Sequence, residues 1–417
     1  MREQGGTVTL DSQQLVLQLP AWFAEPTMPF EQFTMRARWS LEERDRMEVH
    51  LDKLAFAQGP LSASLSGSHQ IVMSDRPGRA GGVIDLQGQL SGKPGSLQLT
   101  GISRRLPDTS RAPYAGVEWH TLDVGLERDR PKLESALAGV DSVVHLAWQI
   151  QPNRDLDQLY RTNVTGTANV LKASRKAGVK QIVCASSIGA YSKGPKDRRT
   201  DESWPAQGMA GSHYSRHKAA QEKLLDEFAA AEPGIAVARL RPGLIFQRDA
   251  GSEIGRYFLG PLIPRLLPRR PWLPLLPAPD NLIFQAVHAD DVAEAYWRVI
   301  DQRASGAFNV AAEPVLTPQE LARIVQARRI LPIPMGLLHK AVGLAWRLRL
   351  IPTDSGWVEM AAGVPVMDTG RARRVLGWEA KTSSVAAVLD VIDGIGTGEG
   401  VTPSPALKPR HGNPSTG

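Results

Sequence analysis

Residues 214–218 read YSRHK, and the spacing of four between Tyr214 and Lys218 is the most informative pattern in the chain. On a helix, residues four apart lie one above the other, so this spacing places an ammonium beside a phenol. A neighbouring cation favours ionisation of the phenol, whose free pKa is about 10. The pair could then act as a general base near neutral pH, with the hydroxyl of the upstream Ser186 or Ser187 holding a substrate. The alternative is an aromatic packed on a helix beside a solvent-facing lysine, because such spacings also arise by chance.

The sequence around this pair alternates between short apolar strands and longer helical segments. Predicted strands cover residues 97–102, 117–122, 142–146, 181–186, 235–240 and 307–310, and predicted helices cover 131–137, 156–177, 212–231, 292–300, 318–326, 372–376 and 383–392. Alternation of this kind predicts an α/β fold, a Rossmann-like doubly wound parallel sheet with helices on both faces.

The chain changes character near residue 95. Before it, segments such as Phe33–Trp39 and Met47–Leu54 alternate apolar and polar residues between Gly- and Pro-containing turns, which predicts antiparallel strands. After Gly394 the sequence lacks the apolar residues needed to pack. The predicted parts are an antiparallel β-rich segment over 1–95, an α/β domain over 96–393 and a disordered tail over 394–417.

Composition limits the classes of function. The formal charge is +6 without a dense Lys/Arg block, so nucleic acid is not an expected partner. The apolar stretch Ile333–Leu350 contains Lys340, Arg347 and Arg349, which argues against a membrane span. The single cysteine, Cys184, has no partner for an internal disulfide, and the expected location is cytoplasmic. The expected partner is a small-molecule substrate, and a homodimer stays open.

Further motifs follow one another in a consistent order. They are Asp123-Val124 after a predicted strand, HLAW at 145–148, NVTGT at 163–167, SSIGAY at 186–191, RPG at 241–243, VHADDV at 287–292, and DT at 368–369 leading to LGW at 376–378. Over about residues 97–393 the chain resembles the extended short-chain dehydrogenase/reductase family, the NAD(P)-dependent epimerase/dehydratase group. Each motif alone is weak, and their agreement in order carries the resemblance. The resemblance implies that residues 96–393 form a truncated Rossmann-like NAD(P)-binding domain with a substrate-binding part at about 248–285 and 330–370.

The resemblance implies a mechanism. Tyr214 would exchange the substrate hydroxyl proton, Lys218 would lower the pKa of Tyr214 and bind the nicotinamide ribose, and Ser187 would hold the substrate oxygen. The implied activity is that of an NAD(P)-dependent oxidoreductase, epimerase or dehydratase acting on a hydroxy or keto substrate such as a nucleotide sugar. The implied cofactor-binding residues are Ser103, Arg104, Arg105, Asp123, Val124, Leu146, Ala147, Trp148, Lys218, Pro242 and Gly243.

The choice between NADP and NAD depends on the residues after the predicted strand 97–102. The sequence there reads Ser103-Arg104-Arg105, where NAD users of the family carry an acidic residue. Arginine binds phosphate through forked, charge-assisted hydrogen bonds, so the pair suits a 2′-phosphate. The expected cofactor is NADP or NAD, with NADP favoured.

The family's opening strand and glycine-rich turn are missing. No G-x-x-G-x-x-G sequence occurs in the chain, and residues 97–102 stand where the second strand belongs. The turn lets backbone amides approach the pyrophosphate at a helix N-terminus, so its loss predicts weak cofactor binding.

Residues 8–92 resemble instead a fragment of an AsmA-like envelope protein, which implies either a true fusion or a joined gene product. Two alternatives to an active enzyme therefore stay open. One is a nucleotide-binding or regulatory relative without turnover, and the other is an inactive fusion product.

Overall fold

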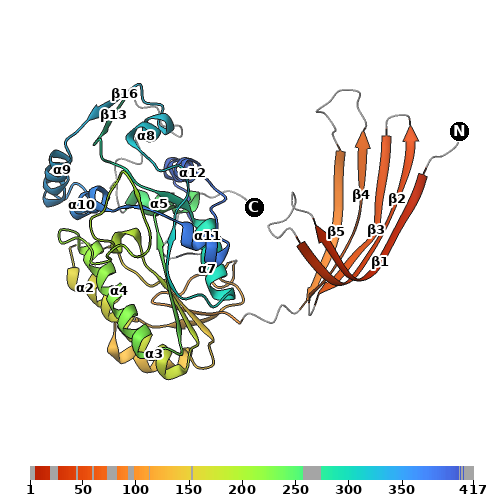
Figure 1. The fold of residues 1–417 in the computed structure, drawn as a ribbon, viewed down its shortest axis with the longest axis horizontal. Coiled ribbons are helices and arrows are strands. Elements are labelled where there is room, and N and C mark those ends of the chain that lie inside the picture. The colour runs from red at the N-terminus through yellow and green to blue at the C-terminus, as the bar shows by residue number, and fades with distance from the viewer. Residues whose placement is uncertain are drawn as a thin grey trace. The chain divides into compact units, whose positions relative to one another are not determined.

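The computed structural model divides the chain into two compact units, Met1–Leu99 and Thr100–Gly417 (Figure 1). The residues that it describes are 5–18, 27–43, 46–58, 61–72, 82–92, 98–111, 113–151, 154–256, 274–402, 404 and 407.

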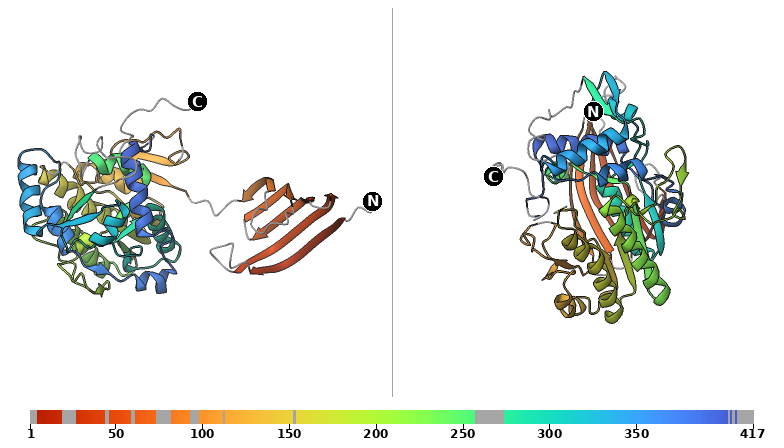
Figure 2. Two further views of the ribbon diagram at one scale, coloured as in Figure 1. Left: turned by 90° about the horizontal axis from the view of Figure 1, so that it is seen from above. Right: turned by 90° about the vertical axis from the view of Figure 1, so that its left-hand side faces the viewer.

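The first unit is a single antiparallel sheet. Its strands are β1 (Gly5–Gln18), β2 (Thr27–Glu43), β3 (Arg46–Gln58), β4 (Leu61–Val72) and β5 (Gly82–Gly92). Each strand pairs with the next one in the chain, in the order β1-β2-β3-β4-β5, and the strands lie side by side in one layer (Figure 2). The period-two alternation before residue 95 indicates this arrangement.

A four-stranded parallel sheet forms the centre of the second unit. Its strands are β8 (Ser142–His145), β9 (Gln181–Ala185), β11 (Ala236–Pro242) and β15 (Gly306–Val310), in the order β15-β11-β9-β8. The crossovers between them include α3 (Gly166–Ala177), α4 (His213–Ala231) and α7 (Ala289–Asp301). Parallel strands need such crossovers because a tight hairpin would reverse the chain direction.

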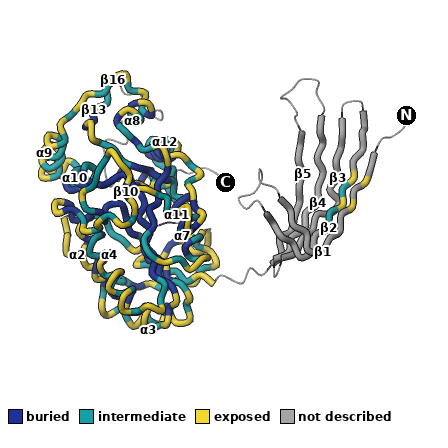
Figure 3. The backbone as a smooth tube through the Cα atoms, in the orientation of Figure 1, coloured by how far each residue is buried: buried dark blue, intermediate teal, exposed yellow. Residues whose placement is uncertain are grey.

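Both faces of this sheet are covered by helices. On β9, Ile182 and Cys184 pack in a core with Val170 of α3 and Leu225 of α4. Val183 points the other way, into a second core with residues of α7 and of α11 (Gly370–Leu376). In Figure 3, the residues coloured as buried accordingly lie in the middle of the second unit. The predicted doubly wound α/β fold is confirmed.

The parallel sheet is interrupted. Strands β6 (Thr100–Ser103) and β7 (Glu118–Thr121) pair with each other in a separate two-stranded sheet, and β8 is the edge of the four-stranded one. A doubly wound sheet has the strand order 3-2-1-4-5-6, in which β7 and β6 would be strands 3 and 2 and β8 would be strand 4. No described strand occupies position 1, and Val144 of β8 is 38% exposed. The missing first strand inferred from the sequence therefore coincides with a break in the sheet.

The remaining elements form shorter structures around this core. The helices are η1 (Glu127–Asp129), α1 (Arg130–Ala136), α2 (Leu156–Tyr160), η2 (Arg161–Thr165), η3 (Ile188–Ala190), η4 (Arg248–Ala250), α5 (Gly251–Ile254), α8 (Pro318–Ile324), α9 (Met335–Arg347), α10 (Gly356–Gly363) and α12 (Ser384–Thr397). The strands are β10 (Arg199–Thr200), β12 (Leu244–Phe246), β13 (Leu275–Ala278), β14 (Ala286–His288), β16 (Arg329–Pro332) and β17 (Val366–Met367). None of the described helices is long and apolar enough to cross a membrane. In the predicted substrate-covering segment 248–285, residues 257–273 lie outside the described part.

The prediction of a disordered tail from residue 394 does not hold for residues 394–397, which are helical. Helix α12 continues to Thr397, and Gly394 packs directly on the carbonyl of Arg248. The carboxylate of Glu399 then pairs with the Arg248 guanidinium at 2.5 Å. The sequence signal misled because a glycine-rich stretch here permits close packing and one ion pair adds an anchor. Residues 408–417 of the predicted tail lie outside the described part.

We predict that Gly243→Ala destabilises the second unit by about 1–3 kcal/mol, because overpacking displaces backbone. A methyl group at Gly243 would lie 2.5 Å from the main-chain oxygen of Gln285, next to β14. Gly234→Ala is the matched control, since nothing lies within 4 Å of its added methyl group. Chemical denaturation of both variants measures the difference, and equal stabilities would contradict the packing argument.

Candidate active site

Helix α4 presents Tyr214, Lys218 and Glu222 along one face. Its N-terminus is capped by Ser212, whose side chain accepts a hydrogen bond from the Ser215 N–H at 3.3 Å. Steps of four along a helix keep side chains on the same side. That side faces the carboxyl end of β9, where Ser186 and Ser187 follow the strand.

Ser187 lies beside the Tyr214 phenol and acts to lower its pKa. Ser187 also caps η3, accepting from the Gly189 N–H at 3.0 Å. The Tyr214 ring lies against Gly189, where a methyl group would be 2.8 Å from a ring carbon, so the close approach depends on glycine. The structure thus brings together the predicted base and the predicted substrate-holding serine.

Burial raises the pKa of Tyr214 above its usual value, and the neighbouring Ser187 lowers it by less. Burial disfavours the phenolate anion. Lys218 is not among the groups that shift the pKa of Tyr214 here, so its lowering of that pKa stays a prediction. Tyr214 is a neutral phenol at pH 7 and can donate a proton.

The Lys218 ammonium contacts a main-chain carbonyl, a side-chain amide and an aromatic ring. The side chain is 2% exposed, and Nζ donates to the Ala185 carbonyl at 2.6 Å and to Gln221 Oε1 at 3.1 Å. Nζ also lies 3.4 Å from the centre of the Trp148 ring, which is a cation–π contact. Burial lowers the pKa of Lys218 to about 7, against the opposing effects of Cys184 and Glu222.

Two tryptophans enclose Tyr214. The Trp148 ring, after β8, meets Tyr214 edge-on at 5.7 Å between centroids. Trp357, from α10, lies 4.9 Å from Tyr214 at an angle of 39°. Sequence reasoning did not find Trp357, because nothing local links residue 357 to residue 214.

Sequence reasoning also missed a buried ion-pair network. The Glu222 carboxylate accepts from Arg239 at 2.8 Å, from Arg241 at 2.9 Å and from the Ser186 hydroxyl at 2.5 Å. Burial opposes ionisation, but the two guanidinium groups outweigh it and hold the pKa of Glu222 at about 2. The sequence does contain a signal for this network. Glu222 lies eight residues after Tyr214, so both lie on the same face of the helix, and Arg239 and Arg241 are two residues apart on one strand, so both lie on the same face of the sheet.

The network extends from α4 toward β15. Arg241 donates to the Tyr191 hydroxyl at 3.0 Å, and that hydroxyl donates to Asn309 Oδ1 at 2.6 Å. Asn309 in turn donates to the Asp368 carbonyl at 2.9 Å. Arg241 and Tyr191, both within family motifs, therefore have structural partners here.

The predicted adenosine-side residues lie at the ends of β6 and β7. Ser103 closes its own turn by accepting from the Arg105 N–H at 3.1 Å, and Arg104 and Arg105 are exposed. Asp123 accepts from the Gly125 N–H at 2.8 Å, and the Val124 carbonyl accepts from Asn169 of α3 at 2.9 Å.

The other predicted cofactor residues follow β8 and β11. Leu146 is 59% exposed and Ala147 is also exposed, whereas Trp148 covers Lys218. Pro242 and Gly243 are buried at the end of β11, and the Gly243 N–H donates to Val310 at 2.9 Å. Gly243 thus has a packing role of its own.

The described residues fit the ends of a nicotinamide dinucleotide and not its middle. Beside Lys218 and Tyr214, the buried Trp148 Nε1 has no acceptor within the described part of the chain. A buried donor without a partner is rare, and a ligand carbonyl there would satisfy it. At the other end, Arg104 and Arg105 can receive a phosphate. For the pyrophosphate between them, no described residues form a G-x-x-G-x-x-G turn.

A doubly wound sheet with a Tyr–Lys helix and a serine at the strand ends defines a short-chain dehydrogenase/reductase core. The model of the NAD dependent epimerase/dehydratase family matches residues 90–311, more than half of the sequence. The chain belongs to the NAD-dependent epimerase/dehydratase family.

Two curated relatives illustrate the range of similarity. An uncharacterized protein, y4nG, of Sinorhizobium fredii is 26% identical over 267 residues, 63% of this chain and 65% of the relative. N-acetyl-α-D-glucosaminyl-diphospho-ditrans,octacis-undecaprenol 4-epimerase of Escherichia coli O157:H7 is 37% identical over 134 residues, 31% of this chain and 39% of the relative. The chain spans less than two thirds of the length of these relatives.

Solved structures share the fold. A double mutant of a dTDP-glucose 4,6-dehydratase from Streptomyces venezuelae, with NAD bound, has a TM-score of 0.51 at 19% identity, covering 71% of this chain and 87% of that chain. The UDP-glucose 4-epimerase of Thermus thermophilus, in complex with NAD, has a TM-score of 0.50 at 20% identity, covering 72% of this chain and 92% of that chain.

We predict that Glu222→Gln destabilises the second unit by about 3–5 kcal/mol, because two buried guanidinium groups lose their shared carboxylate. Glu227→Gln is the control on the same helix, since Glu227 is exposed and pairs with Lys223 only at 3.8 Å. That variant should stay within about 1 kcal/mol of the parent. Urea denaturation followed by circular dichroism compares them, and a stable Glu222→Gln protein would show that the network is dispensable.

Proposed function

We propose that the chain is an NAD(P)-dependent oxidoreductase of the epimerase/dehydratase type, with Tyr214 as the acid/base toward a hydroxy or keto substrate. The observation that carries the proposal is the position of Tyr214 beside Ser187 at the carboxyl end of β9, with Lys218 one turn further along α4. Ligands of doubly wound folds bind at this end of the strands.

The raised pKa of Tyr214 favours one direction of proton transfer. A neutral phenol can give its proton to a carbonyl oxygen of the substrate as negative charge develops there. Ser187 would hold the same oxygen through its hydroxyl, and Trp148 and Trp357 would limit the access of water. The nicotinamide, when bound, would supply the hydride for the substrate carbon.

Lys218 has two proposed tasks. Its third donor would reach the nicotinamide ribose, since two acceptors already take the others. With a pKa of about 7, the amine is close to half protonated at neutral pH, so its charge responds to a bound ligand. Repositioning of Trp148 would bring this charge toward Tyr214.

The proposed cofactor and the proposed substrate class are supported by separate observations. Arg104 and Arg105 support a 2′-phosphate and hence NADP. A nucleotide sugar is the proposed substrate class, supported by two fold neighbours, a dTDP-glucose 4,6-dehydratase and a UDP-glucose 4-epimerase.

We predict that Tyr214→Phe lowers turnover by at least about 100-fold while leaving the fold intact, because only the proton donor is removed. Tyr160→Phe is the control, since Tyr160 is half exposed on α2. The assay separates the products formed from UDP-glucose and dTDP-glucose by chromatography, because epimerisation and dehydration cause no net change in nicotinamide absorbance. Equal rates for parent and Tyr214→Phe would remove Tyr214 from the mechanism.

We also predict weak cofactor binding, with dissociation constants above the micromolar range, since the glycine turn is absent from the sequence. NADP should bind more tightly than NAD, and the double change Arg104→Gln, Arg105→Gln should erase the difference. Arg128→Gln, on η1, is the control for loss of a positive charge elsewhere. Isothermal titration calorimetry compares the parent with both variants, and micromolar affinity of the parent would contradict the expected weakness.

A further inference from the structure

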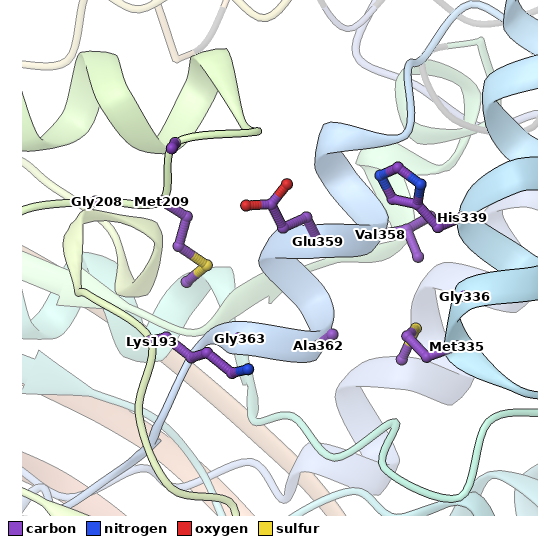
Figure 4. A pocket seen from close by; sticks show the side chains of 11 residues that line it. Lys193, Gly208, Met209, Met335, Gly336, His339, Val358, Glu359, Ala362 and Gly363 are labelled. Atoms are coloured by element: carbon purple, nitrogen blue, oxygen red, sulfur yellow. The ribbon is translucent and has the colours of Figure 1, made fainter.

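A cavity of about 510 Å³ lies between α9, α10 and the loop before α4 (Figure 4). Its size is within the range of small-molecule sites, about 300–1,000 Å³. Met209 and Met335 line it from two sides, with Val358 and Ala362 between them on α10. These four side chains make most of the wall apolar.

Helix α10 separates this cavity from Tyr214. Trp357 stacks on Tyr214, and the Met360 sulfur lies near Gly189, so one face of the helix belongs to the candidate active site. Val358 and Ala362, four residues apart, line the cavity from another face. The cavity therefore lies against side chains of α10 other than those that contact the candidate active site, within the segment 330–370.

One wall of the cavity is formed by Met209 packed against Gly363. A methyl group at Gly363 would lie 2.5 Å from the Met209 sulfur, so the two residues are in tight contact. The Met209 N–H donates to the Ser215 hydroxyl at 2.8 Å, which fixes this wall to the first turn of α4. Methionine adapts its shape to varied apolar ligands, so such a wall accepts more than one ring system.

One positive charge at the cavity lacks a counter-charge. Lys193 is exposed and forms no ion pair with any residue that the structure describes. The carboxylate of Glu359 accepts from the Gly211 N–H at 3.1 Å and points toward that loop in Figure 4. His339, on α9, is the other titratable side chain of the lining.

We propose that this cavity binds an amphipathic anion. An apolar ring system would pack on Met209, Met335, Val358 and Ala362, and a carboxylate, sulfonate or phosphate group would pair with Lys193. Binding requires neither cofactor nor turnover, so this inference stands apart from the proposed enzymatic function.

The test uses two fluorescent dyes and the full chain. 8-Anilinonaphthalene-1-sulfonate carries the anion, and N-phenyl-1-naphthylamine is its neutral analogue. Lys193→Gln should weaken sulfonate binding about tenfold, the effect of one ionic contact, and leave the neutral dye unchanged. Lys340→Gln, an exposed change on α9 outside the lining, should leave both dyes unchanged.

Filling the cavity provides the second measurement. Ala362→Trp should abolish saturable binding of both dyes, with thermal unfolding confirming the fold. Met335→Trp fills the space from α9 and serves if the first variant does not fold. Undiminished dye binding in the folded filled variant overturns the proposal, and so does equal sulfonate affinity in Lys193→Gln and Lys340→Gln.

Discussion

The buried Glu222 carboxylate fastens α4 to the parallel sheet, and the positions of the proposed catalytic side chains depend on it. It bonds Arg239 and Arg241 of β11 and the Ser186 hydroxyl after β9, so three segments meet at one group. A buried charge is tolerated only when it is paired and hydrogen-bonded, so the loss of one partner would destabilise the whole network. Because Tyr214 and Lys218 lie on the same helix face as Glu222, the network also fixes the positions of these two side chains relative to the ends of the strands.

At Tyr214 and Lys218, burial shifts the pKa more strongly than the neighbouring charges do. Desolvation raises the pKa of Tyr214 and lowers that of Lys218 to about 7, so both groups move toward their neutral forms. The Trp148 ring contacts the Lys218 ammonium and meets Tyr214 edge-on. Displacement of this one ring would therefore change solvation and charge at both groups together.

The sequence predicted the parallel sheet, because its strands are apolar runs between helical segments, and it predicted Tyr214 beside Ser187 through ordered motifs. Both predictions rest on local patterns. The stacking of Trp357 on Tyr214 joins residues far apart in the chain and has no local signal. The orientation of Lys218 could not be predicted from the sequence either, because it depends on contacts with the Ala185 carbonyl, the Gln221 amide and the Trp148 ring. The ordered residues after Gly394 were missed because glycine content indicates flexibility as readily as close packing.

The break in the sheet beside β8 separates the proposed catalytic residues from the place where the pyrophosphate would bind. Tyr214, Lys218 and Ser187 rest on α4 and on β9 and β11, whose hydrogen-bonded ladders and cores are complete. The pyrophosphate cradle of a doubly wound fold belongs to strand 1, between β6 and β8, where no described strand lies. The groups that would move protons are therefore held by different contacts from the groups that would hold the cofactor. In this chain the geometry of proton transfer can persist even where affinity for the dinucleotide is lost.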